Sequence, residues 1–236
     1  MDMKTRNAQN TCLQLLHLND PLLPIGGFTH SYGLETYVQK ELVNSSTSAK
    51  KYLECYLQHN FLYNDLLAMR LAWEYAEAKD IDKIQQESSI LCASKSPKEL
   101  RNASAKVGLR FLKLVENKFA QNEFFTSYLN LIKNDKCQSI YSVVYGIATN
   151  ILNIRKEEAM CAISYSTASA IINNCAKLIP LSQMDGQRIL FEIHDVIKEI
   201  VSIAGNLDED DLGMSCIGFD IRSMQHERLY TRLYIS

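Results

Sequence analysis

Residues 187–204 read QRILFEIHDVIKEIVSIA, and this stretch decides the class of fold. Its apolar residues recur every three or four positions, so they share one side of an α-helix while most charged residues take the other side. The apolar stripe consists of Ile189, Leu190, Ile193, Val196, Ile197, Ile200, Val201 and Ala204. Gly205 follows directly and is a typical C-terminal cap. The pattern therefore predicts one amphipathic helix over 187–204.

The same helical spacing extends through the rest of the chain. It marks residues 48–79, 98–119, 138–153 and 157–178. Helix breakers are few, with nine glycines and four prolines in 236 residues. The alternating pattern of a β-strand is weak and confined to the last few residues. We predict an all-α protein, a single bundle of roughly eight to ten helices with a flexible C-terminal tail.

Two regions interrupt this pattern and set the domain organisation. Residues 19–35 contain two of the four prolines and three of the nine glycines, which predicts a loop. Residues 208–211 form the acidic run DEDD and begin a stretch of different character. We therefore expect a helical core over 1–206 that includes the loop at 19–35. An acidic linker with a partner-docking tail is expected over 207–236.

Composition and charge argue against several classes of protein. Hydrophobic residues make up 47% and charged residues 22%, which is typical of a folded globular chain. The net charge of −2 argues against broad binding to nucleic acid or to an anionic membrane. No apolar run is long enough to span a membrane, and the first residues lack a signal-peptide pattern. The seven cysteines are scattered without a CxxC pair, which favours reduced thiols and a cytoplasmic protein.

The motifs of the common enzyme classes are missing. The sequence lacks a GxxxxGK[ST] phosphate loop, a GxGxxG turn after a strand, a GxSxG elbow and an HExxH zinc motif. Cysteine and histidine are present, but no spacing selects a nucleophile and base pair. We therefore expect a chain that is not an enzyme and binds no cofactor tightly.

Five isolated histidines leave one weak candidate for a metal site. His30 lies inside the loop at 19–35, and one imidazole from each of two copies could share a nickel or zinc ion across a symmetric dimer, or hold nickel in transit. Cys12 and His17 are close enough in sequence to contribute. The simpler interpretation is a loop histidine that only forms hydrogen bonds.

Four short motifs, in order along most of the chain, carry a resemblance to a known family. LPIGGFTHSYGLE at 23–35 is similar to L-P-[VI]-G-[GA]-[FY]-[ST]-x-S-x-G-[LI]-E, and ELRNAS at 99–104 is similar to E-x-R-x-x-S. KLIPLSQ at 177–183 is followed by a Gly-Gln pair, and HERLYTRLYIS at 226–236 is similar to H-E-x-x-Y-x-R-L-F-x-S. Together these motifs make the chain resemble the UreF family of urease accessory proteins.

The resemblance implies an all-helical homodimer with no chemistry of its own. UreF-like proteins act as scaffolds that bind a UreD-type accessory protein, called UreH in some species, and the GTPase UreG. The assembly delivers nickel to apo-urease, and some members are proposed to modulate GTP hydrolysis by UreG. Two alternatives stay open, a helical nickel-binding carrier or storage protein and a helical enzyme with an unrecognised site.

The resemblance and the residue chemistry together suggest contact residues. The tail at 221–236 is rich in arginine and tyrosine, which dominate protein interfaces. We expect it to be mobile in the free protein, to become ordered on the UreD-type partner, and to be organised by Arg232. Glu35 and Lys177, charged residues of matching motifs near helix breaks, are expected to face UreG. The expected docking residues of the tail are Arg222, His226, Glu227, Tyr230, Arg232, Leu233 and Tyr234.

Two further groups complete the expected sites. The glycines of the first motif are expected to shape its loop rather than touch a ligand. The motif residues of this loop are Pro24, Gly26, Gly27, Phe28, His30, Ser31 and Gly33. Small side chains within 157–178 permit close approach of a second copy, and we expect a dimer interface there. Its expected residues are Ala162, Tyr165, Ser166 and Ser169.

Overall fold

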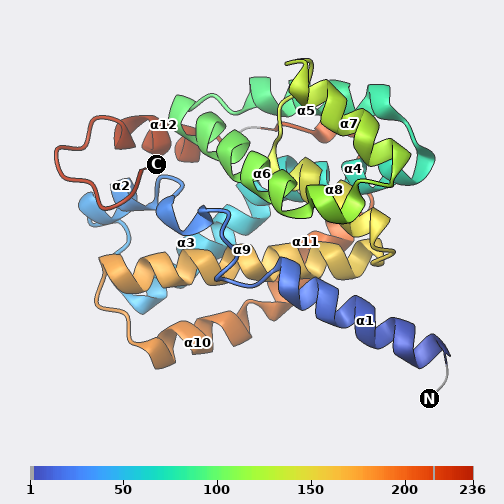
Figure 1. The fold of residues 1–236 in the computed structure, drawn as a ribbon. Coiled ribbons are helices and arrows are strands. Elements are labelled where there is room, and N and C mark those ends of the chain that lie inside the picture. Colours follow the sequence, from blue (N-terminus) through green and yellow to red (C-terminus); the bar gives the residue numbers. More distant parts are fainter. Residues whose placement is uncertain (1–2, 215, 236) are drawn as a thin grey trace.

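A computed structural model describes residues 3–214 and 216–235, and the side chains of residues 3–8 and of Phe28 lie outside this description. Every regular element in the described residues is helical, which confirms the predicted all-α class (Figure 1). None of these helices is both long and apolar enough to cross a membrane. In chain order the elements are α1 (Met3–Leu18), η1 (Gly27–Thr29), α2 (Leu34–Gln39), α3 (Ser46–Tyr56), η2 (Leu57–Leu66), α4 (Leu67–Ala78), α5 (Ile81–Ser94), α6 (Lys98–Phe119), α7 (Glu123–Lys133), α8 (Tyr141–Ile151), α9 (Lys156–Leu178), α10 (Gln183–Glu192), α11 (His194–Ala204), η3 (Glu209–Asp211) and α12 (Ile217–His226).

The core is centred on α4 and α8, which pack against each other along most of their lengths. Residues 142–149 of α8 are all buried, as expected for a helix with neighbours on every side. Gly146 permits this close packing, because a Cβ atom there would lie 2.4 Å from the carbonyl oxygen of Met69. The long helix α9 runs across the width of the molecule and contacts α3, α10 and α11 (Figure 1).

The predicted helices are largely confirmed, with two differences. Segment 98–119 is helical over those same residues, as α6. Segment 187–204 is divided at the buried Ile193 into α10 and α11. The bend lets α10 pack on α3 while α11 packs on η2, and it leaves the apolar stripe continuous, so periodicity does not mark it. Segment 48–79 likewise contains the π-helical η2 between α3 and α4, so the described residues form more helices than the eight to ten expected.

The C-terminal segment is attached to the helical body. Phe219 of α12 packs edge-on against Tyr52 and Tyr56, with ring centroids 5.6 and 5.4 Å apart. The chain beyond α12 then turns back toward α2 (Figure 1), and the Ile235 N–H donates to the Thr29 carbonyl oxygen at 2.9 Å. The segment after residue 206 thus contains a helix, α12, whose apolar side packs on the core. The flexibility expected of the tail in the free protein stays a prediction.

Candidate functional site

Three of the four sequence motifs meet between α2, α6 and α12. Glu35 lies in the first turn of α2, Glu99 lies in the first turn of α6, and His226 is the last residue of α12. We call these three residues, together with Arg232 and the backbone amides of Leu233 and Tyr234, the tail junction. Its contacts join residues between 127 and 199 positions apart in the chain.

The imidazole of His226 lies at the centre of the tail junction, and its side chain is fully buried. Its Nε2 atom is 3.0 Å from Oε2 of Glu35, and its Nδ1 atom is 3.0 Å from Oε2 of Glu99. A carboxylate only accepts hydrogen bonds. An imidazole with a carboxylate at each nitrogen therefore matches the doubly protonated, cationic form.

Glu35 holds the returning tail through its carboxylate. Besides His226, it accepts hydrogen bonds from the N–H groups of Leu233 at 2.7 Å and Tyr234 at 3.2 Å. Gly33 caps α2 with a φ of 84°, and a Cβ atom there would lie 2.6 Å from Oγ of Ser223, so glycine lets α2 approach α12. Glu35 is only 4% exposed. This corrects its expected role, because a carboxylate enclosed by the chain's own donors does not face a partner.

Glu99 and Arg232 form the outer side of the tail junction. Arg232 Nη1 donates to Oε1 of Glu99 at 2.7 Å, which ties the tail to α6. Burial alone raises the pKa of the Glu99 carboxyl, but the hydrogen bonds from His226 and Arg232 outweigh it and leave the pKa below its ordinary value. Glu99 is therefore ionised at neutral pH. That Arg232 organises the tail stays a prediction, and this ion pair is a contact through which it can do so.

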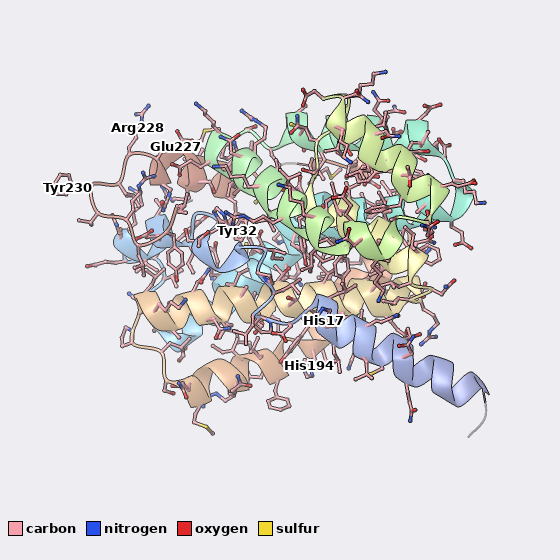
Figure 2. The ribbon with its side chains drawn as sticks, viewed as in Figure 1. His17, Tyr32, His194, Glu227, Arg228 and Tyr230 are labelled. Atoms are coloured by element: carbon pink, nitrogen blue, oxygen red, sulfur yellow. The ribbon has the colours of Figure 1, made fainter. Side chains whose placement is uncertain are left out.

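The tail also presents side chains to the outside. Glu227, Arg228 and Tyr230 point away from the body, and Tyr230 is fully exposed (Figure 2). Of the expected docking residues, the buried ones are His226 and Tyr234, and those wholly or partly accessible are Arg222, Glu227, Tyr230, Arg232 and Leu233. The tail thus has an inner side that binds the body and an outer side that is available for contact.

The loop of the first motif packs against α6 and α9. Arg110 of α6 donates to the Ile25 carbonyl oxygen at 3.4 Å, and Asn174 of α9 donates to the His30 carbonyl oxygen at 3.0 Å. Gly26 has a φ of 78°, which a side chain would strain. Of the other motif residues, Pro24 is exposed, Gly27 is partly exposed, and Gly26, Ser31 and Gly33 are buried, while only the backbone of Phe28 is described.

The burial of His30 does not fit a metal ion shared across a dimer. Its exposed fraction is 4%, whereas a bridging imidazole must reach the surface. Burial first, and then the cations Arg110 and Lys106, lower the pKa of His30, which favours a neutral ring. Cys12 and His17 are exposed on α1, where Figure 2 shows His17. The described residues contain no group of three or more histidine, cysteine, aspartate or glutamate side chains able to hold a metal ion.

A second accessible surface lies on α9 and its neighbours. Tyr165 is 43% exposed, and Phe191 of α10 is 71% exposed. Their rings flank His194, which is labelled in Figure 2, with centroid distances of 6.0 and 5.7 Å. We call this surface the α9 face, and it consists of Ala162, Tyr165, Ser166, Ser169, Phe191 and His194. Sequence reasoning missed Phe191 as a contact residue, although an aromatic residue beside the apolar stripe was the available signal.

Lys177 and a partly open cavity lie outside the tail junction and the α9 face. Lys177 is exposed in the last turn of α9. A cavity of about 160 Å³ lies behind the first-motif loop and is lined by Tyr32, Asp65 and Lys95, among others. Tyr32 has a φ of 54°, which is unusual for an aromatic residue, and Lys95 Nζ lies 3.1 Å from Asp65 Oδ1. Sequence reasoning missed this cavity, because its lining comes from segments far apart in the chain.

Comparisons with known proteins agree with the motifs. The family model described as UreF matches residues 43–194. A protein named urease accessory protein UreF from Actinobacillus pleuropneumoniae serotype 5b (strain L20) is 41% identical over 222 residues, which are 94% of this chain and 97% of the relative. A protein of the same name from Haemophilus influenzae (strain PittGG) is 39% identical over 94% of both chains. Another from Bacillus sp. (strain TB-90) is 34% identical over 96% of this chain and 100% of the relative.

Proposed function

Because the chain belongs to the UreF family of urease accessory proteins, we propose that it is a scaffold in the maturation of urease. It bridges a UreD-type or UreH-type protein and the GTPase UreG during nickel insertion into apo-urease, in the cytoplasm. It catalyses no reaction itself and modulates GTP hydrolysis by UreG. Nickel is the cargo of the assembly and not a resident cofactor of this chain.

The observation that carries this proposal is the two-sided tail. Its inner side is held on the body by the tail junction, and its outer side presents Glu227, Arg228 and the fully exposed Tyr230. Exposed tyrosine and arginine supply much of the binding energy at protein interfaces. The tail is therefore the docking surface for the UreD-type protein. The alternative of a nickel carrier has less support, because His30 is buried.

Size-exclusion chromatography with light scattering tests the docking surface. The chain is co-expressed with a UreD-type protein and then mixed with UreG, nickel and GTP. We expect Tyr230→Ala to weaken the complex by about tenfold or more. The matched control is Ile90→Ala, which truncates an exposed apolar residue on α5. Equal assembly by both variants would overturn the proposal that the tail is the docking surface. Absence of any complex with the wild-type chain would overturn the proposal that the chain is a scaffold.

We assign the homodimer contact to the α9 face. Small side chains beside two exposed aromatic rings permit close packing of the same face of a second copy. Tyr165→Asp is expected to elute as a monomer, because it places a charge in that contact. Tyr230→Asp makes the same change on the tail and is expected to leave the dimer intact. A dimer that persists in Tyr165→Asp would remove this assignment.

A further inference from the structure

A single buried histidine lies between the two carboxylates that hold the tail. Each ring nitrogen of His226 lies 3.0 Å from a carboxylate oxygen, so both nitrogens must donate. If either nitrogen lost its proton, its lone pair would face the carboxylate at hydrogen-bond distance, on an imidazole whose side chain is fully buried. Two acceptors in contact repel each other, and burial increases the cost because no solvent compensates for it.

The charges around His226 also favour a cationic imidazole. The groups that face His226 are Glu35 from α2 and Glu99 from α6, and Arg232 of the tail is paired with Glu99. Tyr234 lies against Glu35. Its burial, and to a smaller extent the negative charge of Glu35, raise the pKa of Tyr234 to about 12, so the Tyr234 hydroxyl stays neutral. On α12 itself, Arg222 donates to Gln225 and lies over the Tyr37 ring. A cationic His226 and Arg232 balance the two carboxylates, whereas a neutral His226 leaves one negative charge without a counter-charge.

Both carboxylates that bind His226 also hold the tail. Glu35 accepts the amides of Leu233 and Tyr234, and Glu99 accepts from Arg232. A change in the charge of His226 therefore affects the same two carboxylates that hold the returning chain. Two other attachments do not involve this histidine, namely the Ile235 amide on the Thr29 carbonyl and the Gln39 side chain on the Thr231 carbonyl. Loss of the charge is expected to loosen residues 227–235 without unfolding the helical body.

We propose that protonation of His226 is a latch for the C-terminal tail. With a cationic imidazole, residues 227–235 lie on α2 and α6. With a neutral imidazole, they leave the body, carry Tyr230 with them and uncover Glu35. Histidine is the side chain whose charge ordinarily changes between about pH 5 and pH 8, so pH is the variable that tests the latch. The latch is a property of this chain alone, whichever partner the tail meets.

Hydrogen exchange of the Leu233 and Tyr234 amides tests the latch between about pH 5.5 and pH 9, after correction for the intrinsic pH dependence of exchange. We expect their protection to fall by about tenfold or more as the pH rises, which corresponds to the loss of one charged hydrogen bond, while amides in α8 keep theirs. His226→Gln is expected to show low protection at every pH. The matched control, His59→Gln, replaces an exposed histidine on η2 and keeps the wild-type profile.

Two results overturn the latch, namely constant protection in the wild-type chain across this range or a wild-type profile in His226→Gln. If His226→Gln does not fold, nitrogen-15 shifts of the His226 ring in the wild-type chain provide the test. Protonation of both ring nitrogens at the acidic end, lost in parallel with tail protection, supports the latch. Loss of a ring proton with unchanged tail protection overturns it.

Discussion

Two buried glutamates, one in the tail junction and one in α5, have opposite surroundings. Glu35 is 4% exposed and accepts hydrogen bonds from His226 and from two backbone amides. Glu87 is 3% exposed, and neither of its carboxylate oxygens has a hydrogen-bond partner among the described residues. Burial, with a smaller contribution from Glu209, raises the pKa of Glu87 well above its ordinary value.

The difference shows that burial alone does not say what a charged residue does. A buried carboxylate stabilises the fold only when donors surround it, and otherwise it takes up a proton or weakens the fold. Glu35 therefore anchors one segment to another, whereas Glu87 is a polar group that the core tolerates. Substitutions at each site, ordered from the largest expected effect on stability to the smallest, test this contrast.

The largest effect is expected for Glu35→Ala. It leaves a buried imidazole and two backbone amides without their acceptor, so the tail detaches and the free energy of unfolding falls by about 1–3 kcal/mol. Urea unfolding and hydrogen exchange of the tail measure the two changes. Glu199→Ala, at an exposed position on α11, is the control and is expected to change stability by less than about 0.5 kcal/mol. Similar small changes in both variants would mean that Glu35 is not an anchor.

Glu87→Gln is expected to act in the opposite direction. A carboxyl whose pKa is raised in the folded protein contributes stability that is fully present below its unfolded pKa of about 4.3 and is lost as the pH rises through the folded value. The amide has no charge to lose, so the variant should be more stable than wild type at neutral pH, by about 1 kcal/mol or more, and equal to it near pH 4. Thermal unfolding across this range measures the difference. A destabilised variant at neutral pH would indicate that Glu87 has a donor.

A smaller effect is expected for Glu99→Gln. Because the pKa of Glu99 is lowered in the folded protein, its contribution is present above the unfolded value of about 4.3 and is lost as the pH falls through the folded value. The side chain is 26% exposed, so the loss at neutral pH should be about 1 kcal/mol or less. At neutral pH, Glu87→Gln should therefore be more stable than the wild-type protein, and Glu99→Gln should be less stable. Denaturant midpoints at acidic and neutral pH test this, and a loss that persists at acidic pH would contradict the assignment.

The smallest effect on stability is expected for Lys177→Ala. Its side chain is exposed at the end of α9, so the unfolding midpoint should not change measurably. If Lys177 faces UreG, the variant should bind the GTPase more weakly, and the difference should shrink as salt is added. Lys51→Ala, an exposed lysine on α3, is the matched control in the same binding titration. Equal affinity of both variants at low salt would remove Lys177 from that contact.

Local patterns predicted the helical elements well, and they failed where distant segments meet. The bounds of α6 follow from Pro97 and from the spacing of Val107, Phe111 and Val115. The bend at Ile193 could not be predicted, since an apolar stripe continues through it and only the neighbours of α10 and α11 differ. The motif patterns marked Glu35, Glu99 and His226, but nothing in them indicated that these residues touch.

The sequence by itself determined the all-α class and the UreF family, because helical periodicity and short motifs are properties of neighbouring residues. Only the tertiary structure decided that Glu35 faces inward, that His30 is buried, and that the tail lies on the body. Each of these depends on contacts between segments more than a hundred positions apart, such as that between Glu35 and His226. The charge of a buried group depends on the donors and acceptors that folding brings around it.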